Sequence, residues 1–388
     1  MPKLDQDIYL IAALRTPIGK FGGALASLTA PQLGVASAKA TIERSGIDPA
    51  KIDEVIFGNA RQAGVGPNSA RQIAIKSGLR HEVPAYTVNQ ACGSGLRAIM
   101  NAADQIRLGQ AEVVLAGGTE SMSNTPYLLM RARWGTKMGN QELVDGMYRD
   151  GFMCPLADEM MGATAETLAD RYDISRKEQD EFAMQSQKKA ERAYADNRFA
   201  DEIVPLEKLQ RDEHPRFDTD LGSLAKLPPV FRKDGTVHAG NSSGVTDGAS
   251  SMLVISAGAV RKHGLKPMAR VVGYAQAGVD PKIMGIGPVP ATQNLLRDVG
   301  MKLSDIDLIE LNEAFAAQVL ACDRELHFDM SKVNVHGGAI ALGHPIGCTG
   351  ARITTTLLHA LQSHNKTLGL ATLCISGGMG LSMLVERT

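Results

Sequence analysis

Cys92 has the surroundings that most favour nucleophilic chemistry in this sequence. A short β-prone segment, residues 85–88, precedes it, and apolar residues at helical spacing follow over residues 94–108. We therefore expect Cys92 on a tight strand-to-helix turn that Gly93 and Gly95 make possible. The N–H groups and the positive dipole end of a helix N-terminus stabilise a thiolate. Position alone leaves open the alternative of a small, inert core residue.

A thiolate nucleophile needs a basic partner and a site for negative charge on oxygen, and three later residues could supply them. His344 lies in a glycine-dense turn, where a rigid backbone can present an imidazole. Cys374 ends one buried apolar strand, and Asn312 ends another. Because open α/β sheets place their sites at the carboxyl ends of strands, these residues are candidates for one site. The alternatives are a surface histidine and a cysteine that only fills a strand.

Other catalytic motifs have little support. His336, His344 and Cys348 are accompanied by no CxxC pair and no HExxH, so we expect no metal site. Residues 240–244 satisfy GxSxG, but they follow no buried strand and begin no helix, as a serine hydrolase turn requires. The sequence has no Walker A motif and no GxGxxG after a strand, which disfavours nucleotide hydrolysis and dinucleotide redox chemistry.

Length and composition narrow the class of protein. The 388 residues suggest two or three domains. With 41 basic and 42 acidic residues, the chain has no general field to attract nucleic acid or a membrane surface. No apolar run approaches the roughly 18 residues of a membrane span, and the N-terminus has no apolar signal core. Five irregularly spaced cysteines indicate reduced thiols, so we expect a cytoplasmic protein without nucleic-acid or membrane partners.

The sequence contains segments that resemble an internal repeat. Three pairs of segments resemble each other: residues 46–60 and 300–314, residues 88–89 and 333–334, and residues 113–118 and 370–378. The first pair aligns without a gap and shares a glycine, an Ile-Asp pair and a final alanine. Two β-α-β units with continuous apolar strands predict duplicated α/β domains with buried sheets. Chance similarity between ordinary α/β segments is the alternative.

The stretch between the two copies differs in character. Residues 122–245 are rich in methionine, charge and turns, and Ser175 begins a capping box that predicts a long helix reaching Tyr194. Long insertions often carry binding residues, so we expect this stretch to form a domain over the active face. The predicted division is a first half of residues 1–121 and 246–266, a loop domain of residues 122–245, and a second half of residues 267–388.

Four segments, in this order, resemble the motifs of the thiolase family: residues 89–95, 312–316, 334–350 and 374–380. The resemblance covers nearly the whole chain. It implies an α/β fold of two similar halves in αβαβα layers with an inserted loop domain. It also implies acetyl-CoA C-acyltransferase activity through an acylated cysteine. The reaction would be the reversible ping-pong condensation of two acetyl-CoA molecules, or thiolysis of a 3-ketoacyl-CoA.

The resemblance assigns roles to the candidate residues. Cys92 would be the acylated nucleophile, His344 the residue that activates it, and Cys374 the general acid/base. Asn312 would hold a water that forms one oxyanion hole with His344 Nε2. The second hole would come from the backbone N–H groups of Cys92 and Ser376. A second sulfur is needed because the α-carbon of acetyl-CoA must lose a proton before it attacks the acyl-enzyme.

Coenzyme A thioesters would be substrates, with no permanently bound cofactor, and CoA would lie across the loop domain. Ser243 resembles the family serine beside the pantetheine. Arg216 resembles the arginine that packs on the adenine, with a solvated surface charge as the alternative. Four residues resemble pocket walls, and plain core packing is the alternative for each: Phe231, Phe315, Met161 and Met284.

Two positions depart from the family pattern. Ser376 stands where the family has glycine, which keeps a backbone donor but alters its surroundings. Met160 replaces a histidine that is common in biosynthetic members, so the preferred chain length stays open.

The resemblance also leaves alternatives of function. These are a degradative 3-ketoacyl-CoA thiolase for longer chains, a ketoacyl synthase, which Cys374 disfavours, and a non-catalytic CoA-binding relative. The expected partners are acyl-CoA, CoA and further copies of the chain, in a dimer or tetramer.

Overall fold

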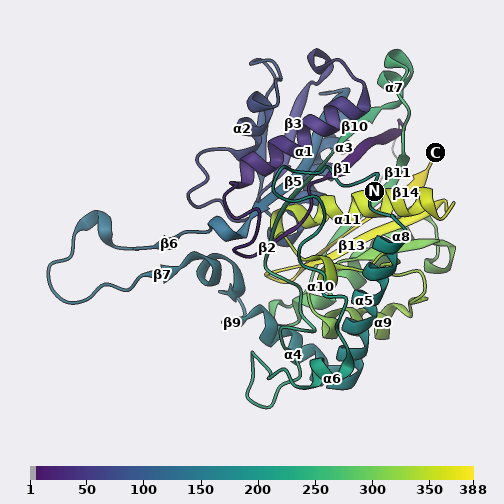
Figure 1. Ribbon diagram of the computed structural model, residues 1–388. Helices are drawn as coiled ribbons and strands as arrows, with labels where there is room; N and C mark the ends of the chain where they lie inside the picture. The colour runs from purple at the N-terminus through teal and green to yellow at the C-terminus, as the bar shows by residue number, and fades with distance from the viewer. Residues whose placement is uncertain (1–5) are drawn as a thin grey trace.

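The computed structural model describes residues 6–388, and a large mixed sheet runs through its centre (Figure 1). Its strands lie in the order β12-β13-β14-β11-β1-β10-β5-β3-β4, with β2 paired to β10. The strand bounds are β1 (Ile8–Arg15), β2 (Gly19–Lys20), β3 (Glu54–Gly58), β4 (Ala85–Val88), β5 (Val113–Ser121), β10 (Thr246–Ser256), β11 (Ala269–Gly278), β12 (Leu308–Leu311), β13 (Leu368–Ile375) and β14 (Met379–Arg387). Every residue of β5 and β10 is buried, although only part of each strand is apolar.

The strand order repeats, which confirms the predicted duplication. The first half reads β1-β10-β5-β3-β4, and the second reads β11-β14-β13-β12 followed by a single bridge from Ile309 to Val333. In both halves the third and fourth strands of this order pair in parallel. A short antiparallel pairing, Tyr9 with Arg270 and Leu10 with Ala269, joins the halves.

One of the predicted correspondences is wrong. Val55 N donates to Pro84 O, and Ile309 N donates to Lys332 O, so the alignment of residues 46–60 with 300–314 places Val333 where Ala85 lies, not Val88. The cause is a difference in strand length. β4 continues to Val88, whereas the second copy turns directly after Val333, at a residue whose φ is +46°.

Helices complete the αβαβα layers. Between the two halves of the sheet, α3 packs against α11; α3 contacts β5 and β3, and α11 contacts β5, β10, β13 and β12. The outer face of the first half is covered by α1 and α2, and α8 covers that of the second half beside α9 (Figure 1). The helix bounds are α1 (Ala30–Ser45), α2 (Ser69–Lys76), α3 (Ser94–Arg107), α7 (Ala257–His263), α8 (Pro288–Val299), α9 (Ala316–Leu326), α10 (Ala339–Leu342) and α11 (Ile346–Ser363).

Glycines let the two central helices touch backbone to backbone. A Cβ on Gly95 would lie 2.7 Å from Ala351 N, and a Cβ on Gly350 would overlap Leu96 N. The two glycines allow the turn through their small size, since a Cβ on Gly93 would lie 2.5 Å from Ile375 Cδ1, and not through an unusual backbone conformation. Gly93 has an ordinary φ of −79°, and the residue with positive φ, +46°, is Ala91. The glycines provide space, and this space brings the starts of α3 and α11 together.

The stretch between the halves contains the predicted long helix. The elements of this stretch are β6 (Tyr127–Leu128), β7 (Val144–Asp145), β8 (Met153–Cys154), β9 (Glu159–Met160), α4 (Met161–Arg171), α5 (Arg176–Ala195) and α6 (Leu221–Ala225). The capping box of Ser175 with Glu178 is present at the start of α5. The exact limits of a separate loop domain remain a prediction. Over residues 6–388, no helix combines the length and apolar character that crossing a membrane requires.

The helix contact predicts a stability difference between two glycine substitutions. Gly350→Ala should destabilise the protein by about 1–3 kcal/mol, because the added Cβ overlaps the backbone of α3. Gly258→Ala in α7 is the matched control, since its Cβ would come no closer than 3.7 Å to another atom. It should be neutral or slightly stabilising. Thermal unfolding measures both, and equal melting temperatures for the two variants would contradict the role given to the helix contact.

Candidate active site

Most of the predicted site residues line one cavity of about 70 Å³ beside the starts of α3 and α11. These residues are Cys92, Met161, Ser243, Met284, Phe315, His344, Cys374 and Ser376. The other lining residues are Arg61, Ala91, Gly151, Phe152, Ala314 and Ile346. The sulfurs of Cys92 and Cys374, which come from opposite halves of the fold, therefore line the same cavity as the imidazole of His344.

Cys92 lies in a 3₁₀ turn (Ala91–Gly93) between β4 and α3. The backbone N–H groups of Ser376 and of Cys92 itself favour the thiolate form of this sulfur electrostatically. Burial nevertheless raises the pKa of Cys92 above its usual 9.0, although the N–H groups and the charge of Arg61 oppose the rise. The stabilisation of a thiolate that we expected from the helix N-terminus is therefore outweighed by burial. The group at rest is a thiol, which needs a base to remove its proton.

His344 is placed to be that base. Thr349 Oγ1 donates to Pro345 O at 3.0 Å and lies 2.6 Å from His344 Nδ1. Because the hydroxyl proton is used on the carbonyl, the hydroxyl accepts from Nδ1–H, which leaves a lone pair on Nε2. Burial, together with the positive charges of Arg352 and Arg61, lowers the pKa of His344 to about 3. The imidazole is neutral at physiological pH.

Cys374 lies near the end of β13 and is almost fully buried. Burial raises the pKa of its thiol well above the usual value, and the neighbouring sulfur of Cys92 raises it further. The two sulfurs are thus close enough for the charge of one to affect the other. A thiol with such a high pKa becomes a strong base once it has lost its proton.

Asn312 lies in the turn after β12 and does not line the cavity, although the nearby residues Ala314 and Phe315 do. Its side chain is completely buried, and neither its amide oxygen nor its amide nitrogen has a partner among the described residues. Buried polar groups are normally paired with protein or with ordered water. The amide is therefore suited to holding a water molecule, the role that the resemblance implies.

Two buried carboxylates that the sequence reasoning missed fix the turns of the site. Glu120 accepts hydrogen bonds from the backbone N–H groups of Ala60 at 3.1 Å, Arg61 at 3.0 Å and Gly347 at 2.7 Å. It thereby ties the turn after β3 to the start of α11. Glu313 accepts from Ile340 N at 3.1 Å and ties the turn after β12 to α10. No motif in the sequence signals Glu120, whereas Glu313 lies within the motif of residues 312–316.

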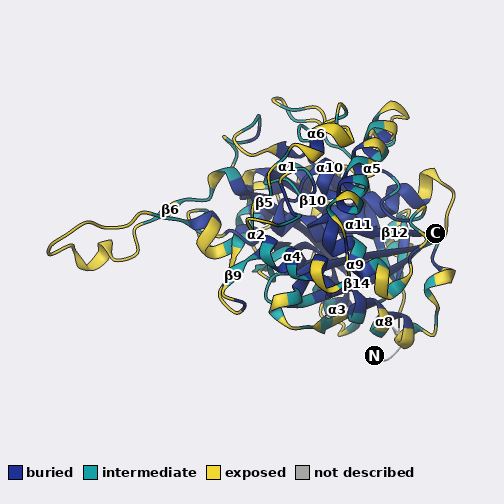
Figure 2. Cartoon of the chain, turned by 90° about the horizontal axis from the view of Figure 1, so that it is seen from below, coloured by how far each residue is buried: buried dark blue, intermediate teal, exposed yellow. Residues whose placement is uncertain are grey.

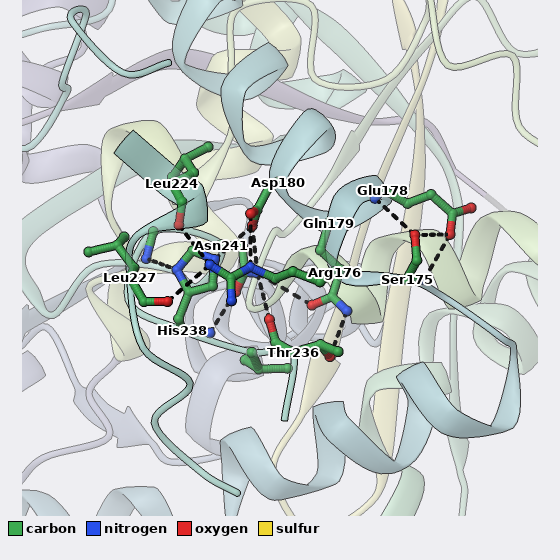
Figure 3. Close-up of polar contacts among 12 residues, drawn as sticks. Ser175, Arg176, Glu178, Gln179, Asp180, Leu224, Leu227, Thr236, His238 and Asn241 are labelled. Carbon is green, nitrogen blue, oxygen red and sulfur yellow. Dashed lines mark hydrogen bonds and ion pairs between the residues drawn. The ribbon is translucent and has the colours of Figure 1, made fainter. Parts of the chain in front are cut away.

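The loop that carries Ser243 is held on both sides. Ser243 N donates to Ala314 O at 3.0 Å, next to the turn of Asn312. Figure 3 shows the polar network behind this loop: the Asn241 amide donates to Asp180 of α5 at 3.2 Å, and His238 Nε2 lies 2.7 Å from the same carboxylate oxygen. Helix α5 therefore positions the loop against the cavity.

Two predicted binding residues lie outside this cavity. Arg216 is exposed and lines a second cavity of about 240 Å³ together with Gln187 and His214. Phe231 packs edge to face on Phe315, with 6.1 Å between ring centroids, so it supports the wall rather than forming it. Arg61 and Phe152 are wall residues that the sequence reasoning missed. For Arg61 the sequence did contain a signal: extending the alignment of the two repeats by one residue pairs it with Phe315, a predicted wall residue.

Across residues 6–388, no group of three or more His, Cys, Asp or Glu side chains is arranged to hold a metal ion. The arrangement that is present can do acyl-transfer chemistry: a thiol, a neutral imidazole, a second thiol and backbone N–H donors around one small cavity.

Comparison with known proteins gives a consistent family assignment. Residues 8–258 match the thiolase N-terminal domain, and residues 265–387 match the thiolase C-terminal domain. Acetyl-CoA acetyltransferases of Pseudomonas aeruginosa and Escherichia coli K12 are each 51% identical over 98% of this chain, and the matches cover 100% and 99% of those proteins.

Comparison with solved structures gives the same family assignment. Human mitochondrial 3-ketoacyl-CoA thiolase in complex with CoA has a TM-score of 0.98 and 45% identity, covering 100% of this chain and 99% of that chain. The acetyl-CoA acetyltransferase of Bacillus anthracis has a TM-score of 0.96 and 46% identity, covering 99% of each chain. This protein belongs to the thiolase family.

Proposed function

We propose that the protein is an acetyl-CoA C-acetyltransferase, which joins two acetyl-CoA molecules to acetoacetyl-CoA and CoA and catalyses the reverse thiolysis. The observation that carries this proposal is the meeting of Cys92, His344, Cys374 and Ser376 in one cavity, where the backbone N–H of Ser376 favours a negative charge on the Cys92 sulfur. Relatives about half identical over nearly the whole chain are named acetyl-CoA acetyltransferases, which supports the same activity here.

The first half-reaction acylates Cys92. His344 Nε2 removes the thiol proton, and the resulting thiolate attacks the carbonyl carbon of acetyl-CoA. The N–H groups of Cys92 and Ser376 then donate to the oxyanion of the tetrahedral intermediate. The C–S bond to CoA breaks, and Cys374 gives its proton to the departing CoA thiolate. The products are CoA and an acetyl-Cys92 thioester.

The second half-reaction forms the carbon–carbon bond. Cys374, now a thiolate, removes a proton from the α-carbon of a second acetyl-CoA. The enolate oxygen is stabilised by His344 Nε2–H and by a water held on the Asn312 amide. One oxyanion donor of this kind contributes about 2.7–4 kcal/mol. The enolate carbon attacks the acetyl group, the bond to Cys92 breaks, and His344 returns the proton to the sulfur.

The two cavities suggest the course of the substrate. Ser243 lines the catalytic cavity and would contact the pantetheine, and Arg216 lines the second cavity and would pack on the adenine. Phe315, Met161 and Met284 wall a volume of about 70 Å³, which suits short acyl groups. A degradative thiolase for longer chains is the second candidate, favoured by the similarity to the human 3-ketoacyl-CoA thiolase.

We place the protein in the cytoplasm, since all five cysteines are free thiols.

Covalent labelling tests the assignment of the two sulfurs. Acetyl-CoA should transfer one acetyl group to Cys92, which mass spectrometry of the intact protein and its peptides detects. Cys92→Ala should abolish both the labelling and the CoA-dependent loss of acetoacetyl-CoA. Cys374→Ala should slow condensation by about a hundredfold or more while Cys92 can still be acylated.

Cys154→Ala is the control, because this buried sulfur lies outside the cavity and is not among the groups that shift the pKa of Cys374. Full activity in Cys92→Ala would refute the mechanism. Turnover with acyl carrier protein but not with CoA thioesters would point to a ketoacyl synthase instead. Rates with 3-ketoacyl-CoA substrates of increasing length decide between the two thiolase candidates.

The pKa shifts predict how the free enzyme reacts with a neutral haloacetamide. Only the thiolate is alkylated, and a raised pKa of Cys92 lowers the thiolate fraction at any given pH. The alkylation rate should therefore rise about tenfold per pH unit through neutrality and level off only above pH 9.0. His344 should add no step between about pH 5 and 8, since its pKa is about 3. A plateau already reached near neutrality would instead indicate a thiolate–imidazolium pair.

An extended arm suggests self-association. Figure 2 shows the segment that begins at β6 and returns through β7 projecting from the body, coloured as exposed over most of its length. Trp134 is 86% exposed and Met138 is 93% exposed at this arm. Exposed apolar groups gathered on one projection mark an interaction surface. We therefore include a homo-oligomer, a dimer or tetramer, in the proposal.

Light scattering should report a mass above that of one chain. Replacing Trp134 and Met138 together by serine should lower that mass, whereas Leu108→Ser, which removes an exposed leucine outside the arm, should not. A monomeric mass for the unmodified protein would contradict this part of the proposal.

A further inference from the structure

Arg61 is a buried cation at the catalytic cavity that takes part in no step of the mechanism, although its charge lowers the pKa of Cys92 and of His344. It follows β3 by three residues, is only 6% exposed, and lines the cavity with Cys92 and Phe152. Its Nη1 donates to Asp150 O at 3.0 Å. Its Nε and Nη2 are buried and have no hydrogen-bond partner among the described residues. A guanidinium carries five N–H donors, so most of this one's hydrogen-bonding capacity is unused.

The nearest acidic group does not satisfy these donors. Glu120 contributes to the electrostatics around Arg61, but its oxygens are already occupied. Oε1 accepts from Asn59 Nδ2 at 2.6 Å and from Arg61 N at 3.0 Å, and Oε2 accepts from Ala60 N at 3.1 Å and from Gly347 N at 2.7 Å. The guanidinium itself forms no ion pair within residues 6–388.

A buried charge with open donors is costly unless an anion pairs with it. Among the lining residues that the structure describes, Arg61 alone is permanently charged, and the remaining walls are largely apolar. Nη2 lies against the backbone of Gly151, where an added Cβ would overlap it. The glycine therefore leaves room for the guanidinium at the wall of the cavity where the acyl group is to be bound.

We propose that the acyl site of this enzyme accepts acyl groups that end in a carboxylate, which pairs with the guanidinium of Arg61. The substrate class is 3-ketoacyl-CoA with a short chain and a terminal carboxylate. This inference rests on the proposed thiolase activity and extends it to a second kind of acyl group. Guanidinium and carboxylate match in a two-pronged geometry that a neutral chain end cannot use.

The chemistry follows the same steps in the direction of thiolysis. The Cys92 thiolate, whose proton is on His344, attacks the 3-keto carbon, and the bond between C2 and C3 breaks. The electron pair goes to C2, which takes a proton from Cys374 and leaves as acetyl-CoA. The carboxylate-ended acyl group stays on Cys92. CoA then gives its thiol proton to Cys374, attacks the thioester and releases Cys92, which regains its proton from His344.

Two other roles for Arg61 give different results. If Arg61 bound a phosphate of CoA, its loss would weaken every CoA thioester equally. If it only anchored the backbone at Asp150, its loss would again affect all substrates alike. The ratio of kcat/KM for two substrates that differ only at the chain end separates these roles from the proposed one.

The substrates are 3-oxoadipyl-CoA, which ends in a carboxylate, and 3-oxohexanoyl-CoA, which has the same chain length and ends in a methyl group. The unmodified enzyme should favour the carboxylate by about ten- to hundredfold in kcat/KM. Arg61→Leu should reduce this ratio to one or below, and Arg61→Lys should restore part of it. Arg80→Leu is the matched control, since this exposed arginine carries the same charge outside the cavity. It should leave the ratio unchanged.

An unmodified enzyme that prefers the methyl-ended chain, with the same ratio in Arg61→Leu, would overturn the inference. Acetoacetyl-CoA is assayed in parallel, so that its turnover shows whether the proposed thiolase activity stands on its own. Should no 3-ketoacyl-CoA be turned over, equilibrium binding of succinyl-CoA and butyryl-CoA to Cys92→Ala, with and without Arg61→Leu, still decides the role of Arg61. Equal binding of both ligands in both proteins would overturn it.

Discussion

The site depends on the direct contact between the backbones of α3 and α11. These helices belong to opposite halves of the duplicated fold, and each places a reactive residue just before its first turn: Cys92 before α3 and His344 before α11. Side chains at the contact would hold the helix axes apart. Glycine at positions 95 and 350 removes that obstacle, so that a thiol and an imidazole from distant parts of the chain reach one cavity. Packing of two helices is thus the condition for catalysis.

Burial then determines the protonation states with which catalysis begins. It raises the pKa of both cysteine thiols and lowers that of His344, so the three groups are neutral at rest. In the proposed mechanism, charge appears only when substrate is present, at the position where backbone N–H groups donate to it. In that mechanism the same closed surroundings also keep water away from the acyl-enzyme thioester. The small volume of the cavity and the shifted pKa values of its two thiols and its imidazole are therefore both consequences of burial.

The sequence predicts what depends on local pattern. Apolar periodicity and the capping box at Ser175 locate α3 and α5, and strand ends locate Asn312 and Cys374. It fails where tertiary packing decides. Ala91, not a glycine, adopts the positive φ before Cys92, because the chain must turn there to begin a helix that is packed on its neighbour. The partners of Glu120 come from segments more than fifty residues away, and no local pattern records them.

The duplication gives two halves with equivalent positions, and the residues that differ between these positions form the site. At the carboxyl end of the second strand of each repeat, one half has Gly58 and the other has Asn312. Gly58 is required because a Cβ would overlap the backbone of Ser94 at the start of α3. The second half carries at this position an amide whose two polar atoms have no partner within residues 6–388, which suits it to holding a water. Three residues further on, Arg61 faces the cavity from one half and Phe315 from the other. Equivalent positions thus provide helix packing and a cation on one side, and the proposed oxyanion site and an apolar wall on the other, which a symmetric pair of halves could not do.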